Sequence, residues 1–224
     1  MTATLLALDT ATEACSAALL HEGRLFHRVE VAPRMHAQLL LPMIDELLAE
    51  AGIALAQVDA LVFGRGPGAF TGVRIATGMV QGLAFAIGKP VIGISNLAAL
   101  AQRAWREQGA EQVCAAIDAR MDEVYWGCYH LVDGVMTLAG AERVCAPEQV
   151  DLAPELTTPV GAGTGWQYAE RLAVPVQRSW PQMLPDATDL ISLALPAWRA
   201  GQVLDAADAQ PVYLRDKVAT PKVG

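Results

Sequence analysis

Hydrophobic residues near the start of the chain fall into three short runs separated by polar turns, which is the pattern of strands joined by hairpins. The runs cover residues 5–8, 15–20 and 24–31. Residues 36–51 then repeat apolar side chains at helical spacing, and Gly52 follows where a helix commonly ends. The pattern predicts a three-stranded antiparallel meander followed by a helix.

The chain then alternates between strand and helix patterns. We expect strands at 60–63 and 91–94, and helices at 72–87 and 96–107. Neighbouring parallel strands need a crossover connection, so an alternation that follows a meander predicts a mixed sheet with helices packed on it.

The second half begins with the same pattern as the first. Three further runs, at 113–117, 124–132 and 135–144, predict a second meander, with a hairpin turn at Asp133-Gly134. Weaker patterns follow, which predict a strand near 159–161, a short helix after residue 164, a helix at 187–200 and an extended, locally basic tail at 211–224.

Two successive meander-plus-helix units predict an α/β protein with the duplicated ribonuclease-H-like fold of the actin and sugar-kinase type. The expected domains are 1–107, which carries two strongly apolar helices, and the smaller 108–224, which ends in the tail. Architecture of this kind does not by itself establish an activity.

Composition narrows the class of function. The chain has 224 residues, of which 53% are hydrophobic, and a formal net charge of -8. A large apolar fraction predicts a substantial core, whereas the acidic balance argues against independent binding to nucleic acid. Four widely spaced cysteines, no basic leader and no apolar run of bilayer length favour a cytoplasmic protein without a membrane segment.

The segment GRGPGAFTGVR, at 64–74, is the most specific local motif. Gly66 and Gly68 permit close backbone approach, Thr71 is placed to cap the following helix, and Arg74 adds a positive charge to its first turn. The loop is either a binding loop, which would hold an anion or the backbone of a partner, or a structural turn between strand and helix. The residues do not decide between these interpretations.

Two acidic turns occupy matching places in the halves, DTATE at 9–13 and DARMDE at 118–123. In the kinase-like superfamily such turns face nucleotide phosphates, but these lack the glycines that expose backbone amides, so carboxylates that cap the turns are favoured. Glycines at 161 and 163 could border an adenosine pocket. The candidate nucleotide or anion residues are therefore Asp9, Thr10, Gly66, Gly68, Thr71, Asp118, Arg120, Gly161 and Gly163.

No residues suggest a catalytic centre. The four histidines form no pair at metal-ligand spacing, and no serine lies in a nucleophile motif. We therefore expect neither a catalytic residue nor a metal site.

The helix predicted at 72–87 has a single charged residue, Arg74. Glycines 78 and 82 recur four residues apart, which makes a smooth ridge that admits another helix, while a second face is bulky. Such a helix is either buried within its own domain or part of a protein interface.

Taken in order, LALDTAT, MHAQLLLPMIDELL, GRGPGAFTGVRIATGMVQGLAFA, KPVIGISNLAALA, DARMDEVYWGCY and PVYLRD resemble the TsaB family across nearly the whole chain. One departure is Ala69, where the family usually has serine, so a hydroxyl there is not essential. TsaB is a paralogue of TsaD, which transfers the threonylcarbamoyl group to tRNA. TsaD has a metal-binding histidine pair at positions that correspond to Asn96 and Leu100, and neither residue here supports that role.

The resemblance implies a non-catalytic accessory subunit in tRNA threonylcarbamoyladenosine modification. It implies binding to TsaD and TsaE, a functional link to TsaC, a homodimer when alone, and room for ATP or ADP with magnesium at the complex interface. The predicted interface residues are Leu40, Met43, Ile44, Leu47, Arg74, Gly78, Met79, Gly82, Leu83 and Phe85. The alternatives are a nucleotide-dependent kinase-like enzyme and a metallopeptidase-like protein.

Overall fold

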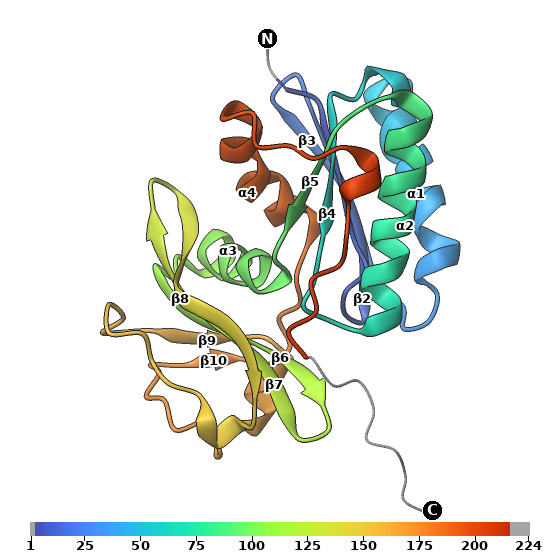
Figure 1. Ribbon diagram of the computed structural model, residues 1–224. Helices are drawn as coiled ribbons and strands as arrows, with labels where there is room; N and C mark the ends of the chain where they lie inside the picture. Colours follow the sequence, from blue (N-terminus) through green and yellow to red (C-terminus); the bar gives the residue numbers. More distant parts are fainter. Residues whose placement is uncertain (1–2, 216–224) are drawn as a thin grey trace, which may run out of the picture.

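The computed structural model describes residues 3–215 and contains two five-stranded sheets (Figure 1). In the first sheet an antiparallel meander is extended by two parallel strands. Its spatial order is β3 (Arg24–Val31), β2 (Ala14–His21), β1 (Leu5–Asp9), β4 (Ala60–Gly64) and β5 (Val91–Ile94). The central strands β1 and β4 are buried throughout, as expected for strands covered on both faces.

The second sheet repeats this arrangement. Its order is β8 (Val135–Cys145), β7 (Glu123–Val132), β6 (Gln112–Arg120), β9 (Val160–Ala162) and β10 (Ser179–Trp180). Strands β8, β7 and β6 form an antiparallel meander, and β9 and β10 are parallel to β6. The repeated order confirms the predicted duplicated ribonuclease-H-like α/β fold.

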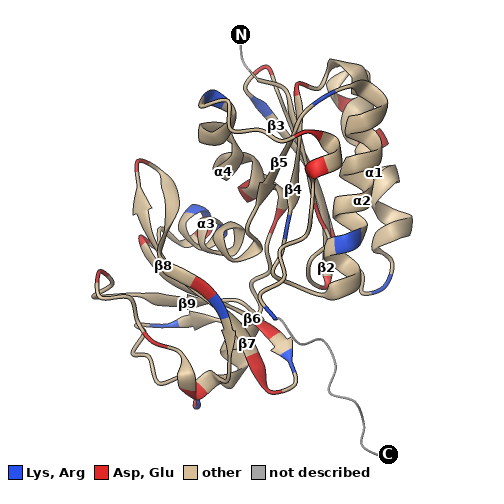
Figure 2. Ribbon diagram, in the orientation of Figure 1, with Lys and Arg blue, Asp and Glu red and all other residues tan. Residues whose placement is uncertain are grey.

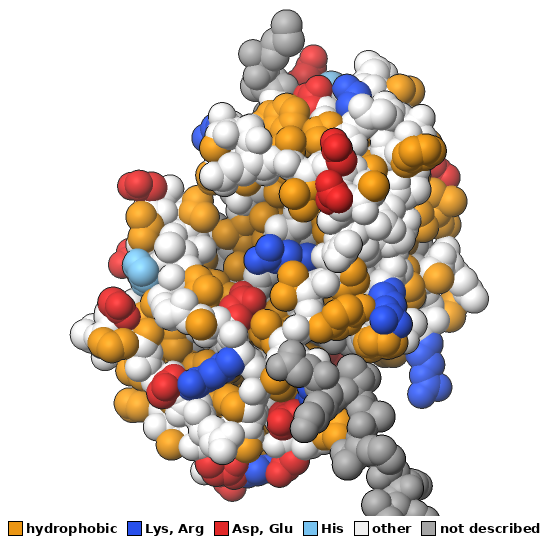
Figure 3. Space-filling view, in the orientation of Figure 1, with side chains coloured by type: hydrophobic (Ala, Val, Ile, Leu, Met, Phe, Trp, Pro, Cys, Tyr) orange, Lys and Arg blue, Asp and Glu red, His pale blue; other side chains and the backbone are white. Residues whose placement is uncertain are grey.

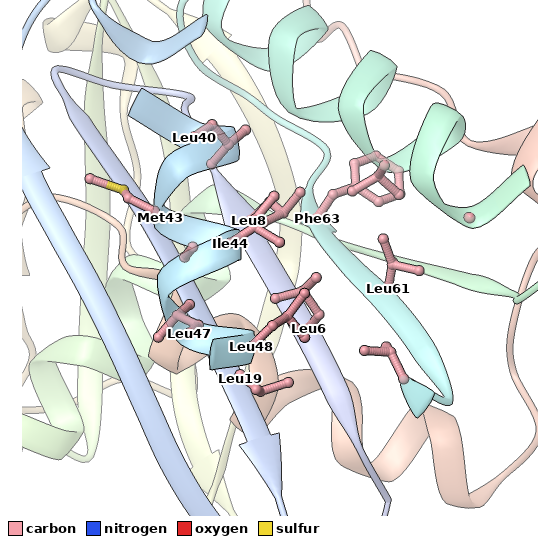
Figure 4. Packing of buried hydrophobic residues seen from close by; sticks show 14 of the residues in the cluster. Leu6, Leu8, Leu19, Leu40, Met43, Ile44, Leu47, Leu48, Leu61 and Phe63 are labelled. Carbon is pink, nitrogen blue, oxygen red and sulfur yellow. The ribbon is translucent and has the colours of Figure 1, made fainter. Parts of the chain in front are cut away.

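Two helices cover one face of the first sheet. Helix α1 (His36–Ala51) ends at Gly52, which has the left-handed φ of 70°, and α2 (Phe70–Ile87) lies beside it (Figure 1). Leucines of α1 and its single isoleucine, Ile44, pack against side chains of the sheet, as Figure 4 shows. This cluster is the main core of the first half.

Helices α3 (Asn96–Gln108) and α4 (Ala187–Arg199) lie between the two sheets (Figure 1). Helix α4 covers the second face of the first sheet, while α3 packs mainly on the second sheet. The predicted domain 108–224 is therefore corrected in one respect: its helix α4 packs on the sheet of the other half. The order of the elements along the sequence could not show that the chain returns to the first sheet at α4.

After α4 the chain continues along the first half. Leu204 pairs with Val91 of β5, the Gln81 side-chain amide donates to the carbonyl of Ala209, and the Val212 amide donates to the carbonyl of Arg65. The predicted extended tail at 211–224 is described as far as residue 215; its remaining residues lie outside the described part of the chain.

Most predicted elements are present, with small differences in their ends. Helix α2 begins two residues before the predicted start, and the short strand β10 had no recognisable pattern. Four short 3-10 helices are also present in the described residues, at Leu55–Gln57, Pro147–Gln149, Thr164–Tyr168 and Ala206–Asp208.

Helix α2 is long and apolar enough to cross a membrane by length and composition alone, with a mean hydropathy of 1.3. A single helix of this kind is a weak indication of a span, because core helices of globular proteins meet the same criterion. About a third of its residues are buried, and Val80 and Ala84 among them belong to the core of the first sheet.

Candidate functional site

The glycine-rich loop between β4 and α2 packs directly on the turn between β1 and β2. The Ala69 amide donates to the carbonyl of Ala11 at 2.7 Å, and the Thr10 hydroxyl donates to the carbonyl of Gly72 at 2.7 Å. A Cβ atom added to Gly72 would lie 2.0 Å from the backbone oxygen of Thr10. The glycines are therefore needed for backbone to approach backbone, and the partner that they approach is the chain itself.

Asp9 lies beneath this contact and is 1% exposed. One carboxylate oxygen accepts from the amide of Ala11 at 2.8 Å, and the other accepts from the side-chain amide of Asn96. The Asn96 oxygen in turn accepts from the amide of Gly66 at 2.8 Å, which ties the strand end, the loop and α3 together. Burial raises the pKa of Asp9 to about 7, although both hydrogen bonds oppose the rise. The carboxylate caps the turn, as the turn-capping interpretation predicts.

Asp118 has a corresponding role in the second half. It accepts from the backbone amide of Arg120 at 2.9 Å and also contacts the guanidinium of Arg120 at 2.9 Å. Residues 120–122 all have positive φ, between 55° and 63°, and none of them is glycine. Three such residues in succession are uncommon outside constrained turns.

An interdomain cleft of about 680 Å³ lies between the loop that precedes α2 and the turn between β6 and β7. Of the nine candidate nucleotide or anion residues, Gly68, Asp118 and Arg120 line it. The sequence reasoning missed Tyr125, and it missed Tyr213 and Arg215, which reach the cleft from the tail.

Arg215 lines the cleft and is held there by the β6–β7 hairpin. Its guanidinium donates to the carbonyl of Ala119 at 3.0 Å and pairs with Glu123. The local positive charge of the predicted tail was the signal available, but it did not indicate where the arginine would lie.

The other six candidates do not line the cleft. Asp9 and Thr10 are buried beneath the loop, and Gly66, with a φ of 102°, lies against the backbone of Val212. At Gly161 an added Cβ would overlap the Trp166 ring. At Gly163, where φ is 105°, it would lie 2.2 Å from the backbone oxygen of Ala116. Close packing within the fold therefore accounts for glycine at both positions. An adenosine pocket is not needed to explain them.

The prediction that Thr71 caps α2 is wrong. The helix begins at Phe70, so Thr71 lies within the first turn and the N-cap is Ala69, with φ -62° and ψ 126° and no side-chain hydrogen bond. A hydroxyl or carboxylate at an N-cap accepts from the free amides of the first turn, and an alanine cannot.

Ala69→Ser is therefore expected to raise the free energy of unfolding by about 1 kcal/mol, because serine can accept one of these amide hydrogens. Urea denaturation of the variant and the original chain measures the difference. Ala69→Val, which adds bulk without an acceptor, is the control. An equal gain in both variants would show that capping is not the cause.

Helix α1 presents its predicted interface side chains inward. Leu40, Met43, Ile44 and Leu47 are between 0% and 8% exposed and belong to the core beneath the helix (Figure 4). Their assignment as surface anchors is corrected. Their spacing identified a buried face, but the chain's own sheet covers it.

Helix α2 differs because part of its apolar and glycine face is open. Phe85 is 83% exposed, and an added Cβ at Gly78 or Gly82 would meet no atom of residues 3–215 within 4 Å. Met79 and Leu83 are half-buried against the core. Arg74, the single charged residue of the helix (Figure 2), stacks 3.5 Å above the Phe70 ring centroid. We call the exposed row Phe70, Arg74, Gly78, Gly82 and Phe85 the α2 surface.

The α2 surface is continuous at helical spacing, since its members are three or four residues apart. Figure 3 shows hydrophobic side chains and backbone, with few charges, over this part of the molecule. At its start the Arg74 guanidinium donates to the hydroxyl of Tyr213 at 2.8 Å, which joins the surface to the tail and the edge of the cleft.

Asn96 and Leu100, which the resemblance aligns with the histidine pair of TsaD, both pack inside this fold. Asn96 is fully buried and engaged with Asp9 and Gly66, and Leu100 is fully buried in the core beside the second sheet. Within residues 3–215 no group of three or more histidine, cysteine, aspartate or glutamate side chains is placed to hold a metal ion.

Comparison with known proteins places this fold in a class. Residues 29–177 match the family model of TsaD, described as tRNA N6-adenosine threonylcarbamoyltransferase. A solved structure, YeaZ from Pseudomonas aeruginosa, superposes with a TM-score of 0.93 at 62% identity, over 95% of this chain and 100% of that chain. The chain is thus a member of the TsaD-related class of duplicated folds.

Two relatives define the family more closely. The tRNA threonylcarbamoyladenosine biosynthesis protein TsaB of Escherichia coli is 43% identical over 98% of this chain and 97% of its own length. The protein of the same name from Haemophilus influenzae is 44% identical with the same coverage. The chain belongs to the TsaB family of tRNA threonylcarbamoyladenosine biosynthesis proteins.

Proposed function

We propose that this chain is a non-catalytic accessory subunit, which binds TsaD through the α2 surface and supports threonylcarbamoyl transfer to tRNA together with TsaE, after TsaC has made the activated intermediate. We place the protein in the cytoplasm, and we propose that it forms a homodimer through an overlapping surface when TsaD is absent.

The observation that carries this proposal is the pair of open glycines beside an exposed phenylalanine. Each glycine in a helix interior costs about 1 kcal/mol relative to alanine. Within residues 3–215 no contact explains why glycine stands at positions 78 and 82, since no described atom lies within 4 Å of either added Cβ. A partner helix that must approach closely would require glycine at both positions. Burial of Phe85 would contribute about 2 kcal/mol to the binding of that helix.

The non-catalytic part of the proposal rests on Asn96 and Leu100. A histidine pair at these positions would have to displace the contact of Asn96 with Asp9 and the packing of Leu100 in the core. In this chain the two positions stabilise the fold, which supports a subunit that assists catalysis elsewhere. ATP or ADP with magnesium at the interface with TsaD stays a prediction.

Gly82→Leu is expected to abolish copurification with TsaD, because the new side chain would stand on the surface that the partner must approach. Leucine favours helix more than glycine does, and no atom of the described residues lies near the new Cβ, so the variant is expected to fold. Circular dichroism checks the fold, and affinity capture of tagged TsaD measures binding.

Thr137→Leu is the matched control, since it adds the same side chain to an exposed position of β8 on the other sheet. Normal TsaD binding by folded Gly82→Leu would remove the α2 surface from the proposal. Reconstituted tRNA modification with and without this chain tests the accessory role separately, and equal product in both reactions would exclude it.

A further inference from the structure

Cys114 and Cys128 face one another across the antiparallel strands β6 and β7. Their Sγ atoms are 3.9 Å apart, and both side chains belong to the cluster on the outer face of the second sheet. Cys15 and Cys145 are not members of this pair. The function proposed above does not use these thiols.

The register of the strands places the two cysteines at a favourable position for a cross-strand bond. The Leu131 amide donates to the carbonyl of Glu111, which marks 111 and 131 as a hydrogen-bonded pair. Such pairs alternate along the ladder, so Cys114 and Cys128 form a non-hydrogen-bonded pair. At such pairs the Cα atoms are about 4.5 Å apart, which is within the range that a disulfide accepts without backbone movement.

We propose that Cys114 and Cys128 are a redox-active dithiol, which hydrogen peroxide or a related hydroperoxide converts into a reversible disulfide. The bond would close a ring from 114 to 128 around the β6–β7 turn, where Asp118 and Arg120 line the cleft. Oxidation would therefore lock the hairpin that forms one wall of the cleft.

The environments of the two thiols set the order of the steps. The pKa of Cys128 lies below its ordinary value because of its hydrogen bond with Cys114, whereas the same bond and burial raise the pKa of Cys114. Burial raises the pKa of Cys15 and of Cys145. Cys128 is also 4% exposed while Cys114 is fully buried, so Cys128 is the first thiol to react.

The chemistry balances with peroxide as the oxidant. The Cys128 thiolate attacks one peroxide oxygen, the O–O bond breaks, and the sulfur becomes a sulfenic acid while hydroxide leaves and takes up a proton. Cys114 then attacks this sulfur, the S–O bond breaks, and water leaves with the thiol proton as the disulfide forms. Two thiols are oxidised, and one peroxide is reduced to two molecules of water.

The test treats the reduced full-length chain with hydrogen peroxide and then blocks the remaining thiols by alkylation. Trypsin cleaves after Arg120, between the two cysteines, so the disulfide would join peptides 107–120 and 121–143. We expect this linked pair, a mass lower by two hydrogen atoms, reversal by dithiothreitol, and a melting temperature that rises on the order of 5–10 °C on oxidation.

Cys114→Ala and Cys128→Ala are expected to lose the linked peptides, and Cys145→Ala is the matched control that keeps them. Peptide mapping of the original chain tests for the disulfide even if a variant fails to fold. Peroxide treatment that leaves both thiols free to alkylate, gives only sulfinic or sulfonic acid at Cys128, or links cysteines of different molecules would overturn the proposal.

Discussion

Gly72→Ala is expected to lower the free energy of unfolding by about 3 kcal/mol or more, because the new methyl group would overlap backbone rather than a flexible side chain. Its Cβ would lie 2.0 Å from the carbonyl oxygen of Thr10. The loop and the turn would have to separate, and the hydrogen bonds that join them at Ala69 and Thr10 would weaken. Urea denaturation followed by circular dichroism measures the loss.

Gly78→Ala is the matched control on the same helix. In the described part of the chain no atom lies within 4 Å of its added Cβ, and alanine is favoured over glycine in a helix interior, so we expect a gain of about 0.5–1 kcal/mol. Effects of the same sign and size at both positions would mean that contact with the β1–β2 turn is not what requires Gly72.

The second large effect concerns the buried carboxylate of Asp9. Its pKa is raised from 3.8 to about 7, chiefly by burial, so the folded state holds its proton more tightly than the unfolded state does. Stability from this group is therefore fully present below about pH 4 and is lost as the pH rises towards 7. Three pKa units correspond to about 4 kcal/mol.

Asp9→Asn, which cannot ionise, is expected to remove this pH-dependent loss. The free energy of unfolding of the original chain, minus that of the variant, should fall by about 3–5 kcal/mol between pH 4 and pH 7.5. The difference between the two chains cancels other titrating groups, such as Asp189, whose pKa burial raises to about 6. A difference that stays constant over this range would show that Asp9 ionises normally in the fold.

Much of the fold could be predicted from local patterns. The helix at 36–51 has strict helical spacing and a terminal glycine, and its bounds were predicted correctly. The strand at 91–94 was also predicted correctly. By contrast, β10 has two residues and is held only by pairing with β9, so no periodicity could indicate it.

The candidate site was harder to predict, because its residues meet only in the folded chain. Gly72 contacts Thr10 across 62 positions of sequence, and Arg215 reaches Ala119 across 96. A short motif can show that the backbone must pass close to something. It cannot show whether that neighbour is a ligand, a partner or another part of the same chain.

The sequence by itself determined the duplicated fold and the apolar character of the two first-half helices, because both follow from residue spacing along the chain. It indicated the family through the resemblance of its ordered motifs. Only the tertiary structure decided which apolar faces are covered. It buried Leu40 and Leu47 beneath α1, left Phe85 and Gly82 open on α2, and engaged Asp9 within its own turn. The physical reason is that burial depends on what packs against a side chain, and that neighbour is set by folding rather than by local spacing.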